Sequence, residues 1–196
     1  MKRLLTVFLA LLIVIATTGC GSTTEATEER QTYTRLPFTH YASGGMPEDY
    51  TADILFERSN STFTAYQVAF MSCTCRDPSV NYSSVMYVEL LNTKDTADEA
   101  TIRDITFGSK DGYTVGLWGD SDPVFGQPDY TKEYLDEHFV RQLIKKSKAD
   151  FDAWEGYGKQ IEGIDADAVT GASVSTGNIT SVLQALFAYH ADKYYQ

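Results

Sequence analysis

The chain has 196 residues, three cysteines and a formal net charge of −11 at pH 7. This length fits one domain with a short appendage. The acidity argues against nucleic acid as a partner and against docking to anionic lipid through a basic patch, because both interactions need clustered Lys and Arg side chains.

The first 19 residues have the features of a signal peptide. Lys2 and Arg3 precede a nearly unbroken apolar run at 4–16, which is short for a permanent membrane helix. Residues 17–20, Thr-Thr-Gly-Cys, resemble a bacterial lipobox, in which Cys20 is lipidated and becomes the mature N-terminus. We therefore expect a lipoprotein signal peptide at 1–19 and a lipid anchor on the extracytoplasmic face of a bacterial membrane. A simple secretory signal with an incidental cysteine and an uncleaved anchor are the alternatives.

Two segments follow that lack a regular apolar pattern. Residues 20–31 are rich in Ser, Thr and Glu and are expected to form a flexible tether. Residues 32–59 include His40, a Gly-Gly pair and Pro47, and we expect an irregular N-terminal segment there.

The rest of the chain, 60–196, has the pattern of a single α+β domain. Aromatic and β-branched residues predict strands at 62–71, 85–90, 102–107 and 113–118. The polar stretch 92–100 suits a hairpin connection. Because helices follow the strands, we expect a mostly antiparallel sheet.

Two helices are predicted after the strands. A mid-chain helix is indicated by an apolar stripe between charged residues at Tyr134, Leu135, Phe139, Leu143 and Ile144. A connector at 151–163 and an acidic loop at 163–167 come next. The C-terminal helix is indicated by residues that recur at three- and four-residue steps: Ile179, Val182, Leu183, Leu186, Phe187 and His190. We expect His190 to be a core-edge residue rather than a ligand.

The stretch 167–176 joins the acidic loop to this helix. Ser175 or Thr176 is the expected N-cap, because a short hydroxyl accepts from free N–H groups of the first turn. Ser173 then lies just ahead of a helix N-terminus, where free N–H groups and the helix dipole favour a phosphate. Gly171 and Ala172 leave room for a ligand near the backbone. An ordinary turn and helix cap is the alternative on these grounds alone.

The exact order of residues in this stretch adds a second argument. Asp167, Thr170, Gly171, Ala172 and Ser173 resemble the flavinylation motif Asp-x-x-(Ser/Thr)-Gly-Ala-(Ser/Thr) of the FMN-binding domain family. That family includes the C subunit of sodium-pumping NADH:quinone reductases, the G subunit of Rnf complexes and many surface lipoproteins. The motif lies just before a C-terminal amphipathic helix, as in the family. The one departure is serine, rather than the commoner threonine, at the acceptor position.

The resemblance implies an α+β domain over roughly 60–195. It also implies that an FAD:protein FMN transferase links FMN through a phosphodiester to Ser173. The protein would then carry electrons between a membrane redox donor and an extracellular or periplasmic acceptor, rather than act as an enzyme by itself. Asp167 would serve recognition by the transferase or orient the acceptor hydroxyl, whereas Asp165 and Asp167 as plain solvated loop acids are the alternative.

Cys73 and Cys75 form a Cys-x-Cys pair followed by Arg76. They could form a labile disulfide, contribute to a metal site, or be buried thiols. A metal site has weak support, since no further cysteine exists beyond the lipobox, and we expect none. Arg76 would favour a thiolate, so the pair is a redox candidate.

Trp118 lies between two glycines at 116–119. It could stack on the isoalloxazine ring of FMN, because flat rings gain from stacking, or it could fill the core beside a turn. No dinucleotide-binding Gly-x-Gly-x-x-Gly and no Gly-x-Ser-x-Gly of a serine hydrolase occurs around these residues. The rival function is a non-redox surface lipoprotein that binds a ligand or partner.

Overall fold

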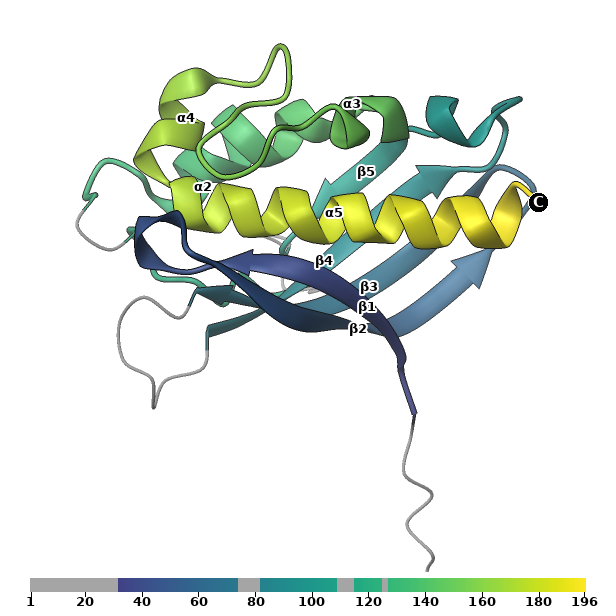
Figure 1. Cartoon of the computed structure of the whole chain (residues 1–196), viewed down its shortest axis with the longest axis horizontal. Helices are drawn as coiled ribbons and strands as arrows, with labels where there is room; N and C mark the ends of the chain where they lie inside the picture. The colour runs from purple at the N-terminus through teal and green to yellow at the C-terminus, as the bar shows by residue number, and fades with distance from the viewer. Residues whose placement is uncertain (1–31, 74–81, 109–114, 125–126) are drawn as a thin grey trace, which may run out of the picture. The chain divides into compact units, whose positions relative to one another are not determined.

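A five-stranded sheet forms one layer of the domain, and the helices lie on one side of it (Figure 1). The computed structural model describes residues 32–73, 82–108, 115–124 and 127–196. Each strand pairs antiparallel with the next along the chain. The strands are β1 (Thr34–Tyr41), β2 (Pro47–Ser59), β3 (Phe63–Cys73), β4 (Tyr82–Leu91) and β5 (Ile102–Thr106). The expected α+β class with an antiparallel sheet is therefore confirmed. Residues Tyr33–Gln196 form one compact unit, and the expected signal peptide, Cys20 and the tether up to residue 31 lie outside the described residues.

The expectation of an irregular segment at 32–59 is wrong. This region forms the hairpin of β1 and β2. Gly44 and Gly45 have φ of 79° and 77°, so the glycines taken as a sign of irregular chain make the turn between two strands. Pro37 is tolerated because β1 is an edge strand, where a missing N–H costs no pairing on the open side.

The central strands match the sequence pattern more closely. The predictions at 62–71, 85–90 and 102–107 correspond to β3, β4 and β5, and the polar connection at 92–100 contains a short 3-10 turn at Ala97–Glu99. The fourth predicted strand, 113–118, is not a strand where the structure describes it. Leu117 makes an isolated bridge to Val85, and residues 109–114 lie outside the described part.

Helical segments follow the sheet in the predicted order. The mid-chain helix is α2 (Lys132–Leu135), which continues as a π-helical turn (Asp136–Val140) and a 3-10 turn (Arg141–Leu143). The later helices are α3 (Lys148–Asp152), α4 (Ala166–Gly171) and α5 (Ser173–Tyr194). The acidic loop is therefore shorter than expected, because α4 begins inside it.

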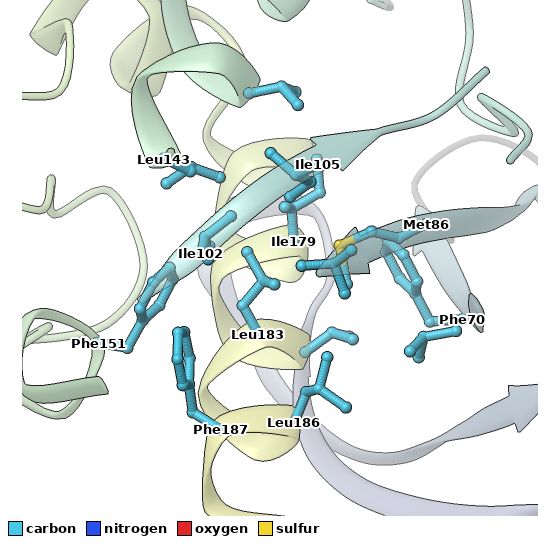
Figure 2. Close-up of a cluster of buried hydrophobic side chains, with 14 of the residues drawn as sticks. Phe70, Met86, Ile102, Ile105, Leu143, Phe151, Ile179, Leu183, Leu186 and Phe187 are labelled. Atoms are coloured by element: carbon cyan, nitrogen blue, oxygen red, sulfur yellow. The ribbon is translucent and has the colours of Figure 1, made fainter. Parts of the chain in front are cut away.

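The long helix α5 packs against the inner face of the sheet and contacts β1 and β3 (Figure 1). Its apolar residues Ile179, Leu183, Leu186 and Phe187 project into a cluster that includes Phe70, Met86, Ile102, Ile105, Leu143 and Phe151 (Figure 2). Leu183 is fully buried, and burial of a side chain of this size contributes about 2 kcal/mol. This core fixes α5, and with it the motif at the start of α5.

The bulge at Ile54–Phe56 in β2 changes which side chains face α5. Phe56 is 43% exposed, whereas Glu57 accepts hydrogen bonds from Tyr189 and Tyr194 and pairs with Lys193 at 2.8 Å. One extra residue in a strand reverses the alternation of its faces, so the bulge anchors the C-terminal end of α5. Across the part of the chain that the structure describes, no helix is both long enough and apolar enough to cross a membrane.

Candidate cofactor site

The motif lies at the junction of α4 and α5. Asp165 caps α4, because its Oδ1 accepts from the N–H groups of Asp167 at 2.9 Å and Ala168 at 3.4 Å. α4 ends at Gly171, Ala172 turns the chain with φ −127° and ψ 39°, and α5 begins at Ser173. The motif therefore connects two helices rather than a loop and a helix.

The expected N-cap at Ser175 or Thr176 is wrong. Both residues lie in the first turn of α5, and its cap, Ala172, offers no side-chain hydrogen bond. Thr176 Oγ1 donates to the Ala172 carbonyl at 3.0 Å, and Ser175 Oγ donates to Asp120. The helix begins earlier than expected because the turn at Ala172 directly follows α4.

Ser173 presents its hydroxyl at the start of α5. Its Oγ donates to the Thr170 carbonyl at 2.8 Å, and the residue is half-buried. Ser173, Thr170, Gly171 and Ala172 all line one cavity of about 320 Å³. The first N–H groups of an α-helix have no intrahelical acceptor, so they can bind an anion there.

The small residues of the motif have separate structural reasons. A Cβ on Gly171 would overlap the ring of Tyr130, so glycine allows α4 to approach that ring. Ala172 is 2% exposed, and a larger side chain would enter the core. Thr170 is exposed, and its Oγ1 donates to the Ala166 carbonyl at 2.8 Å.

Asp167 is placed differently from the rest of the motif. It is exposed in the first turn of α4 and is not among the described residues that line the cavity. The Ser173 hydroxyl is oriented by Thr170, not by Asp167. Asp165 has a clearer structural role than Asp167. A hydrogen bond from the Asp167 N–H lowers the pKa of the Asp165 carboxyl group, and so does His138, whose Nδ1 lies 3.1 Å from Asp165 Oδ2.

A buried polar network, which the sequence reasoning missed, holds the start of α5 against the strand ends. The Asn178 side chain accepts from Tyr41 N at 2.6 Å and donates to Tyr41 O at 3.1 Å and Ser72 O at 2.8 Å. Ser72 Oγ donates to Ser84 Oγ, which accepts from Gly119 N at 2.9 Å. The sequence does carry a signal for this network: small polar residues such as Ser175, Asn178 and Ser181 recur on the same face of the helix as its apolar residues.

The cavity also receives a loop residue and a cysteine. Asp120, held by Ser175, lines it. Cys73, at the end of β3, also lines the cavity; it is 4% exposed and disulfide-bonded. The interpretation of a buried thiol is therefore wrong for Cys73. Cys75 and Arg76 lie outside the described residues.

Trp118 is not brought to the same cavity as Ser173. It lines a second cavity of about 700 Å³ and packs edge-on against Phe107, with ring centroids 5.4 Å apart. Among the described residues that line the Ser173 cavity, the aromatic one is Tyr157, whose ring packs against Gly45. No sequence pattern predicts this position, because Tyr157 lies in the expected connector at 151–163.

The electrostatics of the Ser173 cavity come from the backbone more than from side chains. Among the described residues that line it there is no Lys, Arg or His, and Asp120 adds a carboxylate. An anion at Ser173 would depend on the N–H groups of α5. The described ranges also contain no group of three or more His, Cys, Asp or Glu side chains that could hold a metal ion.

Comparisons with known proteins return no match. No family model matches the chain, and neither a curated protein nor a solved structure is similar to it. The likeness to the FMN-binding domain family thus depends on the motif and on its place before α5.

Proposed function

We propose that this protein is a lipid-anchored, extracytoplasmic electron-transfer flavoprotein that carries FMN in phosphodiester linkage to Ser173. The observation that carries the proposal is the Ser173 hydroxyl, which lies within the motif and lines a cavity of about 320 Å³ at the N-terminus of α5. Cavities of this size are at the lower end of small-molecule sites. The anchor would be Cys20.

The residues around Ser173 fit a phosphate ester of FMN. A phosphodiester keeps one negative charge, which suits the N–H groups and dipole of a 22-residue helix and needs no Lys or Arg. Gly171 and Ala172 line the same cavity without adding a long side chain to it, and Gly171 lets α4 pack against Tyr130. Tyr157 supplies an aromatic wall, and Gln127 and Asp120 supply polar groups for the ribityl hydroxyls or the ring edge.

The attachment would be a group transfer from FAD. The Ser173 Oγ–phosphorus bond forms, the pyrophosphate bond of FAD breaks, AMP leaves with the electron pair of that bond, and the hydroxyl proton passes to solvent. Because Ser173 Oγ already donates its hydrogen to Thr170 O, its lone pairs are available to attack. The exposed Asp167, outside the cavity, is suited to recognition by the FAD:protein FMN transferase.

Bound FMN would supply the one- and two-electron chemistry, and the domain would hold it between a membrane donor and an extracellular or periplasmic acceptor. The Cys73 disulfide is a candidate second redox group, because it lines the same cavity. Thiol labelling before and after mild reduction tests this idea. If Cys73→Ser leaves electron transfer by the loaded protein unchanged, the disulfide has no redox role.

Co-expression with an FAD:protein FMN transferase tests the proposal. After denaturation, flavin fluorescence should migrate with the wild-type polypeptide and with Ser173→Thr, which keeps the hydroxyl. Ser173→Ala should show none, while Ser175→Ala, a second hydroxyl lining the cavity, should stay fluorescent. Equal signals from wild type and Ser173→Ala would rule out Ser173 as the acceptor. Flavin released on denaturation would indicate non-covalent binding, and a complete absence of flavin would favour the non-redox binding lipoprotein.

A further inference from the structure

A second cavity of about 700 Å³ lies between the end of β5 and the helical segment from Lys132 to Arg141. Its volume is in the middle of the range for small-molecule sites, which is about 300–1,000 Å³. The proposed FMN attachment makes no use of this cavity, because Ser173 is not among its described lining residues.

One wall of the cavity is aromatic. Trp118 and Phe107 both line it and meet edge-to-face, with centroids 5.4 Å apart and planes at 84°. Trp118 is half-buried, and its Nε1 donates to Ser121 O at 3.4 Å, which restrains the indole. Val140 also lines the cavity but is buried. A flat ring could pack on this wall with little loss of side-chain freedom.

The remaining lining is charged, with an excess of carboxylates. Four acidic residues and two basic residues line the cavity. Arg141 is engaged by Asp136 at 3.3 Å and Asp104 at 3.9 Å. Glu133 and Glu137 are exposed and have no ion pair within the described residues. These two free carboxylates, one helical turn apart, would attract a cation.

The backbone that carries these acids is unusual. Asp136–Val140 is a π-helical turn inserted between α2 and a 3-10 turn. π-helical turns are rare and occur often at functional sites. This one supplies Asp136, Glu137 and Val140 to the lining of the cavity that Trp118 also lines.

We propose that this cavity is a binding site for a flat aromatic cation. The ring would pack on Trp118, whose face attracts positive charge, and the charge would be balanced by Glu133 and Glu137. An aromatic anion would be disfavoured, because the four acidic side chains of the lining outnumber its two basic side chains, Lys132 and Arg141. The proposal does not depend on FMN, so it can be tested on flavin-free protein.

The test uses tryptophan emission. The chain has two tryptophans, and Trp154, with its Nε1 bonded to Lys159 O, is outside the cavity lining. Trp154→Phe therefore leaves Trp118 as the sole tryptophan reporter. 1-Methylquinolinium is titrated as the probe, with naphthalene-2-sulfonate as the anion of similar shape, and calorimetry on wild-type protein measures the same binding without a reporter.

The cation should quench Trp118 saturably and the anion should not. Glu133→Gln with Glu137→Gln should weaken cation binding about tenfold. The matched control, Glu155→Gln with Glu162→Gln, removes the same charge from exposed positions outside the lining and should change binding less than twofold. Non-saturating quenching, equal behaviour of cation and anion, or equal weakening by the two double variants would overturn the proposal. Because all four glutamates are exposed, these variants should fold.

Discussion

The two halves of α5 differ in what they bury. The first half, taken as residues 173–181, buries mainly small polar residues together with Ile179, whereas the second half, from Val182 onward, buries Val182, Leu183, Leu186 and Phe187, all four fully. The buried polar residues of the first half are Ser175, Thr176, Asn178, Thr180 and Ser181. Apolar burial stabilises the fold without fixing a unique position, while a satisfied polar network specifies one arrangement. The second half therefore holds the helix on the sheet, and the first half sets where Ser173 lies.

The largest change in stability should come from the second half. Leu183→Ala removes a fully buried side chain and should lower the free energy of unfolding by about 3 kcal/mol. Ala188→Ser, at an exposed position of the same half, is the control and should change it by less than about 0.5 kcal/mol. Chemical denaturation measures both. Similar midpoints for the two variants would contradict the assignment of stability to this half.

Asn178→Ala tests the first half. It leaves Tyr41 N, Tyr41 O and Ser72 O without their partner and should cost about 2–3 kcal/mol. Unlike Leu183→Ala, it should also lower flavin attachment when the two variants are compared at equal folded fraction. If attachment falls equally in both, the two halves do not differ in function.

His190 gives the second half a pH dependence. Burial lowers the pKa of His190 to about 4, below the ordinary value near 6.5 of the unfolded chain. The unfolded state then binds a proton that the native state resists, so stability is full above about pH 6.5 and falls by roughly 2–3 kcal/mol toward pH 4. His190→Gln should flatten this slope relative to wild type in denaturation curves across that window. Parallel wild-type and variant profiles would contradict it. The hydroxyl oxygen of Tyr66 lies 2.8 Å from His190 Nδ1, and the variant keeps this tyrosine.

The smallest expected loss of stability comes from Gly171, which lies just before the start of α5. Gly171→Ala places a Cβ against the Tyr130 ring and should cost about 1–2 kcal/mol and reduce flavin attachment. Adding Tyr130→Ala removes the clash, so the double variant should recover attachment relative to Gly171→Ala alone. No recovery would mean that Gly171 acts through the transferase rather than through packing.

The sequence predicted the parts of the fold that depend on local pattern. The aromatic and β-branched runs at 62–71, 85–90 and 102–107 became β3, β4 and β5. The apolar stripe from Ile179 to Phe187 became the buried face of α5. β1 and β2 are not predicted, because Gly44 and Gly45 suit an irregular chain as well as the hairpin turn that they form.

The site was harder to predict because it depends on contacts between distant residues. Cys73 reaches the Ser173 cavity through the end of β3, which Asn178 holds to α5. From sequence alone Trp118 could stack on the flavin or fill the core. In the structure it lines another cavity, and Tyr157 lines the Ser173 cavity. Hydrophobic periodicity in a short stretch of sequence cannot predict such contacts between residues that are far apart along the chain.

The central claim is that one atom, Ser173 Oγ, carries the flavin. Protein co-expressed with an FAD:protein FMN transferase is digested, and its flavin-bearing peptide is sequenced by tandem mass spectrometry. The account predicts the mass of FMN, less one water, on Ser173 and not on Thr170, Ser175 or Thr176. A flavin mapped to one of those other hydroxyls, or a peptide that carries none, would contradict it.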